Sequence, residues 1–141
     1  MSPAPTGPEP RWVGRLVADT VQHDLISMHG GLAGLRDEGL LEAALARPRQ
    51  LWSYGESIDV AALAAAYAYG IARNHPYNDG NKRIAFVVAA VFAELNGYRL
   101  DAPESEVVDA MLKLAAGAIE EAALAEWLRD RLTELGDTHS R

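Results

Sequence analysis

Residues 81–96 are apolar on nearly every face of the helix that they predict, and Gly97 follows as a C-terminal stop. A helix that is apolar all round is buried. Other helices must therefore surround this one. Its apolar residues are Ile84, Phe86, Val87, Val88, Val91, Phe92 and Leu95.

Five further segments have the apolar spacing of helices. The first carries a stripe made of Trp12, Leu16, Val17, Val21, Leu25 and Met28. No internal repeat or long linker divides the chain, so we predict an all-α, single-domain bundle around a central buried helix. The five segments are residues 12–29, 39–47, 60–73, 103–116 and 120–135.

Short polar residues and prolines mark the ends of these helices. Asp37 and Asp59 each precede a helix and are predicted N-caps. Pro48 is expected to end the short second helix, which leaves residues 49–57 as an exposed connection. His75 precedes a proline and so avoids helical geometry, which predicts a boundary there.

The 141 residues suffice for one domain with a hydrophobic core, and we assign it to residues 11–135. Residues 1–10 hold four prolines, which predicts a disordered tail rather than a secretory signal, with a proline-rich docking segment as the alternative. Residues 136–141 are expected to be frayed. No stretch is apolar and long enough to span a membrane, and the absence of cysteine suits a reducing cytoplasm.

The formal net charge is −7, from twenty acidic and thirteen basic residues. Nucleic acids are bound mainly by lysine and arginine that neutralise phosphates, so nucleic acid is disfavoured as a direct partner. Only two lysines occur in the chain, and one of them, Lys82, lies at the start of the buried helix.

That helix begins with Gly80-Asn81-Lys82-Arg83. The first N–H groups of a helix have no helical partners, and the helix dipole adds about half a positive charge there. Two basic side chains at this end cost stability unless an anion binds, and phosphate is the usual anion. The sequence therefore predicts a phosphate site at residues 80–83.

Residues just before this helix suit phosphoryl transfer. His75 carries an imidazole, the usual general base near neutral pH, and Asp79 offers oxygen ligands for a divalent metal ion. Asn78 and Asn81 can hydrogen-bond phosphate or backbone. Together with the basic helix start, these residues form a candidate active site.

The segment His75-Pro76-Tyr77-Asn78-Asp79-Gly80-Asn81-Lys82-Arg83 resembles the signature of the Fic/Doc superfamily, His-Pro-Phe-x-Asp/Glu-Gly-Asn-Gly/Lys-Arg. Tyr77 replaces a phenylalanine that usually anchors this loop in the core. The likeness extends to the death-on-curing (Doc) toxins of type II toxin–antitoxin systems. The further matching segments are His23-Asp24, Gly30-Gly31, residues 34–37, residues 40–48 and Asn96-Gly97.

The resemblance implies a Fic/Doc helical bundle and a role for each residue of the loop. His75 would be the general base, and Asp79 would hold Mg²⁺. Lys82 and Arg83 would also act in catalysis, as charges on the transferred phosphate. The phosphates of ATP would be bound by Asn78, Gly80, Asn81, Lys82 and Arg83.

Two departures from the signature bear on the reaction. Lys82 stands where AMP-transferring members have glycine, and Phe86 where they have a second arginine. The resemblance therefore implies a Mg-ATP-dependent protein kinase that phosphorylates a serine or threonine of a bacterial translation factor, with elongation factor Tu expected. A cognate antitoxin protein would neutralise it, because the chain has no inhibitory Ser/Thr-x-x-x-Glu-Gly/Asn motif.

Alternatives stay open at this point. In the first alternative, the protein is an AMP transferase of the Fic type. In the second, it is a non-catalytic binding module or regulatory relic of the fold. His23-Asp24 also invites comparison with the metal-binding pair of phosphohydrolases, although a structural pair is the simpler interpretation. The resemblance further places a small β-hairpin flap beside the active site, at Arg47, Arg49, Trp52 and Tyr54. The other interpretation of these residues is ordinary surface packing.

Overall fold

Helices α3 (Val60–Asn74) and α4 (Asn81–Leu95) form the centre of the computed structural model, which describes residues 8–136. Ten of the fifteen residues of α3 and eight of the fifteen of α4 are buried. Many of those in α3 are alanines, which favour helix and let neighbouring helices approach closely. The predicted burial of the helix that starts at residue 81 is confirmed, and α3 shares the centre with it.

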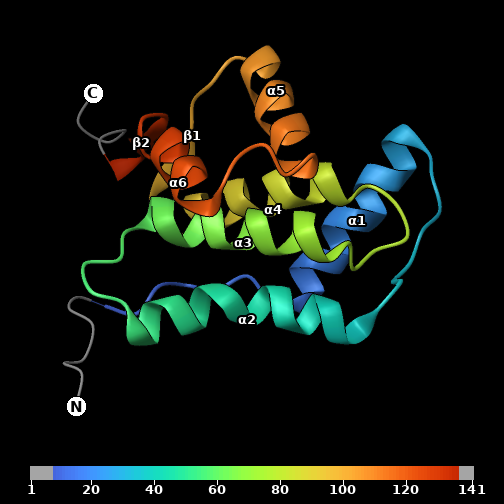
Figure 1. The fold of residues 1–141 in the computed structure, drawn as a ribbon, viewed down its shortest axis with the longest axis horizontal. Coiled ribbons are helices and arrows are strands. Elements are labelled where there is room, and N and C mark those ends of the chain that lie inside the picture. The colour runs from blue at the N-terminus through green and yellow to red at the C-terminus, as the bar shows by residue number, and fades with distance from the viewer. Residues whose placement is uncertain (1–7, 137–141) are drawn as a thin grey trace.

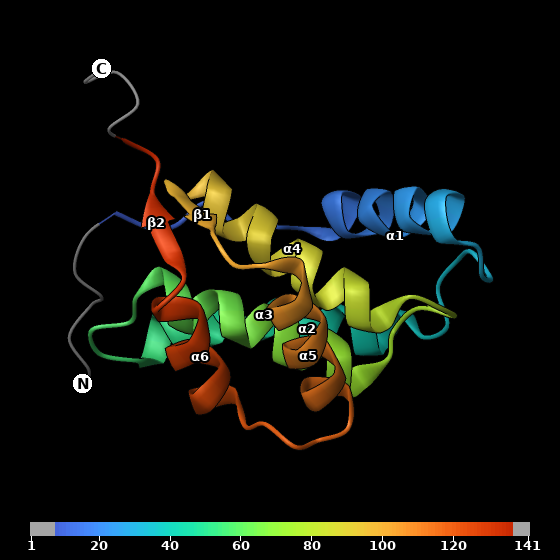
Figure 2. The ribbon, with the colours of Figure 1, turned by 90° about the horizontal axis from the view of Figure 1, so that it is seen from above.

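The other helices pack around this pair (Figure 1). α2 (Glu38–Tyr54) lies along one side of α3, while α5 (Glu104–Ala115) and α6 (Glu121–Arg129) cover the other side. α1 (Arg15–His29) packs against α4 near the end of the molecule where α3 ends (Figure 2). The predicted all-α bundle is confirmed.

Two aspartates cap helices as predicted. Asp37 accepts a hydrogen bond from the N–H of Leu40 at the start of α2. Asp59 accepts one from the N–H of Ala62 at the start of α3. The carboxylate of Asp59 also pairs with the guanidinium of Arg129 at 2.6 and 3.0 Å, which ties the end of α6 to the start of α3.

The second helix is longer than predicted, because it does not end at Pro48. α2 continues through this residue to Tyr54. A proline inside a helix costs roughly 3 kcal/mol. Here Pro48 is buried, and Leu51 and Trp52 pack against the core, so burial offsets that cost. The exposed connection predicted for residues 49–57 therefore begins only after Tyr54, and its predicted start was wrong.

The prediction of a last helix over residues 120–135 is wrong in its second half. α6 ends at Arg129, and β2 (Leu132–Glu134) pairs with β1 (Tyr98–Leu100) in an antiparallel sheet, with Leu100 opposite Leu132. β1 follows Gly97, whose φ of 92° reverses the chain after α4. A pairing between segments so far apart in the chain leaves no mark on local periodicity.

α1 begins at Arg15, later than predicted, and the predicted stripe is only partly confirmed. Trp12, Val17, Val21 and Leu25 pack against the core. Leu16 and Met28, which the predicted stripe included, are 80% and 73% exposed. The buried residues of α1 are Ala18 and Gln22. The inward face of α1 therefore keeps the middle of the predicted stripe, excludes Leu16 and Met28, and also contains a polar residue.

Most of the predicted tails, residues 1–7 and 137–141, lies outside the described residues. Glu9, which is described, accepts a hydrogen bond from the indole of Trp12 at 2.7 Å. The assignment of one domain to residues 11–135 stays a prediction. Among the described helices, none has the length and apolar character needed to cross a membrane.

Candidate active site

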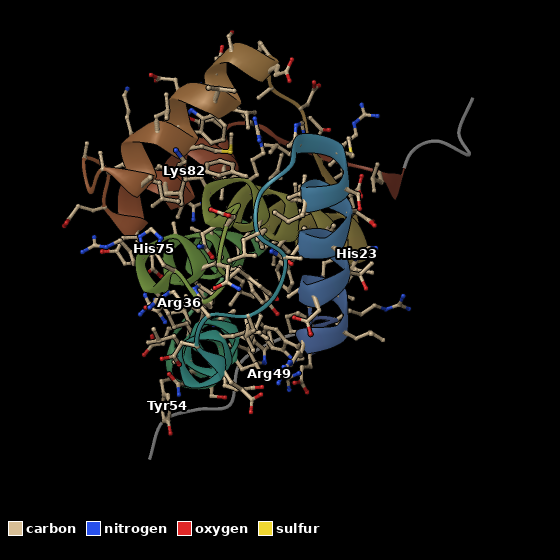
Figure 3. All side chains as sticks on the ribbon, turned by 90° about the vertical axis from the view of Figure 1, so that its right-hand side faces the viewer. His23, Arg36, Arg49, Tyr54, His75 and Lys82 are labelled. Carbon is tan, nitrogen blue, oxygen red and sulfur yellow. The ribbon has the colours of Figure 1, made fainter. Side chains whose placement is uncertain are left out.

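An open cleft of about 720 Å³ lies where α3 ends and α4 begins. Its walls are the last turn of α1, the loop between α3 and α4, the first turn of α4 and one face of α5. Figure 3 faces this end of the molecule and labels two of the residues that line the cleft, His75 and Lys82. The cleft brings together all seven residues that the sequence assigned to the site: His75, Asn78, Asp79, Gly80, Asn81, Lys82 and Arg83.

The loop between α3 and α4 is anchored in the core by Tyr77, as the resemblance implied. This residue is 2% exposed, and its hydroxyl donates to the carboxylate of Asp19 in α1 at 2.7 Å. The side chain of Asn81 accepts a hydrogen bond from the N–H of Tyr77 and donates one to its carbonyl. The oxygen and one N–H of the Asn81 amide thus hold the loop, and its backbone N–H, which has no helical partner, is free for a ligand.

A second segment, residues 34–37, runs along this loop. The N–H of Asn78 donates to the carbonyl of Gly34 at 3.0 Å, and the N–H of Arg36 donates to the carbonyl of Pro76 at 2.7 Å. These bonds resemble a short piece of antiparallel sheet. The chain beside the loop between α3 and α4, which we call the active loop (residues 75–80), therefore comes from the turn between α1 and α2.

The glycine-rich start of that turn contacts two polar side chains of the loop, Asn78 and Asp79. Asp79 accepts a hydrogen bond from the N–H of Leu32 at 2.6 Å, and Asn78 donates to the carbonyl of Ala33 at 3.2 Å. Gly31 permits this approach, because its φ is +115° and a Cβ there would lie 3.2 Å from the Cβ of Asp79. The second carboxylate oxygen of Asp79 has no hydrogen-bond partner within residues 8–136, so a cation can bind there.

The start of α4 has the features of an anion site. Its N-cap is Gly80, with φ 85° and no capping side chain, and the first turn contains no acidic residue. The first helical hydrogen bond of α4 runs from the N–H of Ile84 to the carbonyl of Gly80, so the N–H groups before it have no helical partner. Lys82 and Arg83 are exposed and form no salt bridge with any described residue. Positive charge at this point is thus left uncompensated.

His75 lies at the boundary that the sequence predicted. It caps the C-terminus of α3 with φ 49° and ψ 55°, the left-handed region that residues with a Cβ rarely adopt. Its side chain lines the cleft together with Asp79 and Lys82. An imidazole base, a carboxylate and a cation therefore share one cavity.

One wall of the cleft is apolar, and the sequence did not reveal it. Val108, Met111, Leu112 and Ala115 of α5 line this wall, and Val108 and Leu112 are 41% and 53% exposed. Their spacing predicted a helix correctly. Periodicity alone does not show which side of a helix faces a cleft.

Sequence reasoning also missed Gln22, a buried polar residue of α1 that is 4% exposed. Its side-chain carbonyl accepts a hydrogen bond from the N–H of Gly34 at 3.2 Å, and its amide lies 3.5 Å from the carbonyl of Asp79. It thereby joins the turn after α1 to the active loop. The available signal was a polar residue four positions from both Ala18 and Ile26, on the face that turns inward.

The predicted flap at residues 47–54 is wrong. These residues form the second half of α2, which runs antiparallel to α3, so they approach the end of the molecule away from His75 (Figure 1). A helix of 17 residues is about 25 Å long. The small sheet lies beyond the C-terminal end of α4 and is also remote from the cleft (Figure 2).

His23 and Asp24 are exposed and do not line the cleft. Figure 3 shows His23 on α1, on the side of the view away from His75. Within residues 8–136, no three His, Cys, Asp or Glu side chains are grouped so as to hold a metal ion. A cation at Asp79 would therefore take its other ligands from phosphate oxygens and water.

Comparison with known proteins identifies the family of the chain. Residues 15–93 match the model of the Fic/DOC family. Protein kinase doc of Escherichia phage P1 is 38% identical over 109 residues, which are 76% of this chain and 85% of that protein. Toxin Doc of Mycolicibacterium smegmatis is 46% identical over 77 residues, which are 52% of this chain and 57% of that protein. The resemblance read from the active loop is confirmed, and the chain belongs to the Fic/DOC family.

Proposed function

We propose that this chain is a Doc-like toxin and protein kinase, which transfers the γ-phosphate of ATP to a serine or threonine hydroxyl of a bacterial protein with the help of Mg²⁺. The observation that carries the proposal is the presence of His75, Asp79, Lys82 and Arg83 in one cleft at the start of α4. The phage P1 relative is named a protein kinase and the mycobacterial relative a toxin, which supports both the reaction and the biological role.

The residues of the cleft fit a nucleoside triphosphate bound with a divalent cation. The uncapped start of α4 offers N–H donors, and Lys82 and Arg83 add two cations without described salt-bridge partners. Asp79 has one carboxylate oxygen available for the cation. ATP would supply the phosphoryl group, and Mg²⁺ would neutralise part of the charge on its phosphates.

His75 would accept the proton of the acceptor hydroxyl while the hydroxyl oxygen bonds to the γ-phosphorus and the bond to the β-phosphate oxygen breaks. Lys82 would place a point charge on the phosphates, and Arg83 would bind two of their oxygens through its planar guanidinium. Positioning and electrostatic stabilisation supply most of the catalysis in such reactions. These side chains of the cleft would do both.

Two observations favour transfer of phosphate over transfer of AMP. Lys82 lines the cleft at the position where the resemblance gives AMP-transferring members a glycine. Phe86 is 3% exposed and packs edge-on against Trp127 at 6.1 Å, so it adds no second phosphate clamp to the cleft. The experiment with labelled ATP below must distinguish the proposed kinase from the AMP transferase.

The resemblance to Doc toxins also points to the partners. We propose elongation factor Tu as the target, a cognate antitoxin as the protein that neutralises the toxin, and the cytoplasm as the location. A mass increase on one serine or threonine of the target, read by mass spectrometry, identifies the acceptor.

Labelled ATP tests the reaction directly. Purified protein is incubated with elongation factor Tu and with ATP labelled at either the α- or the γ-phosphate, and His75→Ala serves as the inactive control. We expect γ-label on the target with the wild type and none with the variant. Transfer of α-label alone would establish the AMP transferase, and transfer of neither label to any protein of a bacterial lysate would favour the non-catalytic module.

A further inference from the structure

We propose that Arg36 is a positioning residue, which holds the backbone of His75 in its left-handed conformation and so directs the imidazole into the cleft. The inference rests on the proposed function, because it concerns the base of that reaction. It assigns a role to a residue that lies outside the active loop and does not line the cleft.

The conformation of His75 needs a restraint. Among the non-glycine residues that the structure describes, only Ser57 and His75 have a positive φ. The left-handed position after a helix is usually taken by glycine, because a Cβ there crowds the backbone. Such a conformation persists only where the surrounding structure holds it.

Arg36 supplies that restraint through three successive carbonyl groups. Its Nε donates to the carbonyl of His75 at 2.6 Å, and its Nη2 donates to the carbonyl of Asn74 at 2.9 Å. Its backbone N–H donates to the carbonyl of Pro76 at 2.7 Å. Figure 3 shows Arg36 and His75 on the same side of the molecule, below Lys82.

These bonds fix the two torsions that matter. The carbonyl of Asn74 belongs to the peptide plane before the Cα of His75, and the carbonyl of His75 belongs to the plane after it. Peptide planes are rigid, so the angle between two neighbouring planes is set by φ and ψ of the residue that joins them. One guanidinium that holds both carbonyls therefore restrains φ and ψ of His75.

The chemistry of arginine suits this position. The last carbonyls of α3 have no helical donors and carry the negative end of the helix dipole, which favours a cation. The planar guanidinium presents several N–H donors in a fixed geometry, whereas a lysine ammonium acts as a single point charge. A lysine would keep the charge but hold the two peptide planes less firmly.

The backbone on either side of these bonds is held by further contacts, although Arg36 itself is exposed. The next residue, Asp37, donates its N–H to the same Pro76 carbonyl at 3.0 Å and caps α2 with its side chain. Asn74 is held in turn, since its amide donates to the carbonyl of Leu40 at 3.0 Å. The start of α2 and the end of α3 are thus joined around the base.

Three variants test the inference: Arg36→Ala, Arg36→Lys and, as a control, Arg73→Ala. Arg73 lies in the last turn of the same helix and donates to the hydroxyl of Tyr69 rather than to a carbonyl of the loop. We expect Arg36→Ala to lower kcat by about 10- to 100-fold with KM for ATP within about twofold, as for a misplaced base. Arg36→Lys should lie between it and the wild type, millimolar guanidinium should restore part of the activity of Arg36→Ala, and Arg73→Ala should match the wild type.

A second measurement does not depend on activity. The ¹³Cα and ¹³Cβ chemical shifts of labelled His75 report its backbone torsions, and Arg36→Ala should move them away from left-handed values while Arg73→Ala should not. Unchanged shifts and unchanged kcat in Arg36→Ala would overturn the inference. If Arg36→Ala does not fold, the same comparison between Arg36→Lys and Arg73→Lys decides. A wild type that transfers no γ-phosphate would overturn the proposed function, and the shifts would still decide the role of Arg36.

Discussion

Tyr77 donates its phenolic hydrogen to Asp19 across 2.7 Å, and this bond joins the active loop to α1. Arg15 holds the same carboxylate at 3.3 Å and also reaches Glu38 of α2 at 2.8 Å. Burial, followed by the hydrogen bond to Asp19, raises the pKa of Tyr77 above its ordinary value, so the hydroxyl remains a donor. The loop is therefore connected to two helices outside the central pair.

Tyr77→Phe should lower the free energy of unfolding by about 1–2 kcal/mol, because the ring stays buried while a hydrogen bond to a charged acceptor is lost. The loss is limited because the Asp19 side chain is 44% exposed and can turn to water. Urea unfolding measures it. Tyr54→Phe is the matched control, since Tyr54 is 81% exposed and should show no change. Equal stability of both variants and the wild type would mean that the bond to Asp19 contributes nothing.

The same tyrosine predicts a loss of stability in alkali. An unfolded tyrosine ionises near pH 10.0, whereas folding raises the pKa of Tyr77. Its contribution is therefore fully present below pH 10.0 and is lost as the pH rises towards the folded pKa, with a limiting slope of about 1.4 kcal/mol per pH unit. The free energy of unfolding should fall less steeply in Tyr77→Phe than in the wild type. Parallel slopes would contradict the prediction.

The sequence predicted most of the polar lining of the cleft because these residues are close together in the chain. The proposed base His75, the proposed metal ligand Asp79 and the start of α4 all lie within residues 75–83, so no knowledge of the fold was needed to bring them together. The caps at Asp37 and Asp59 were predicted for the same reason, since each acts on the helix that follows it.

The features that were missed depend on tertiary packing. Arg36, Gln22 and the apolar wall of α5 reach the active loop only because the helices fold together. Pro48 misled in the opposite direction, because burial of the rest of α2 outweighed a local helix breaker. Local patterns predicted which polar residues line the cleft, while the residues that hold them in place required the structure.

Asn81→Ala tests whether this amide serves the loop or the ligand. The variant loses two hydrogen bonds and leaves the N–H and carbonyl of Tyr77 buried without partners, which should cost about 2–4 kcal/mol. Asn81→Asp keeps an acceptor for the N–H and should cost less. Urea unfolding measures both. Wild-type stability combined with lost affinity for ATP would show that the amide binds phosphate instead.

Two substitutions at Asp59 separate its cap from its ion pair. Asp59→Asn keeps an acceptor for the N–H of Ala62 and loses the charge, while Asp59→Ala also loses the cap, which costs about 1 kcal/mol more. The hydrogen bond from Arg129 is the main cause that lowers the pKa of Asp59. Its stabilisation is therefore present above pH 3.8, the ordinary pKa, and lost as the pH falls through the lower folded pKa. Acid unfolding followed by circular dichroism should show this part of the pH dependence in the wild type and not in Asp59→Asn.

Lys82→Gln should raise the stability of the protein without nucleotide and weaken its binding of ATP. A cation in the first turn of α4 opposes the helix dipole, so removing it should raise the free energy of unfolding by about 0.3–1 kcal/mol. Lys113 is the matched control, because it lies in the last turn of α5 and pairs with Asp109 at 3.0 Å. Lys113→Gln should lower stability by about 0.2–0.5 kcal/mol.

Adding ATP with Mg²⁺ should make the wild type more stable than Lys82→Gln, the reverse of the order expected without nucleotide. A ligand stabilises the folded state in proportion to the logarithm of its concentration over Kd, so the rise in Tm should be larger for the wild type than for Lys82→Gln. Lys113→Gln should show the wild-type rise, because Lys113 does not line the cleft. If Lys82→Gln were less stable than the wild type without nucleotide and showed the same rise with it, the basic helix start would have a structural role and would not be the phosphate site. The opposite signs expected at the two lysines separate these interpretations, because both variants lose the same charge from a helix end.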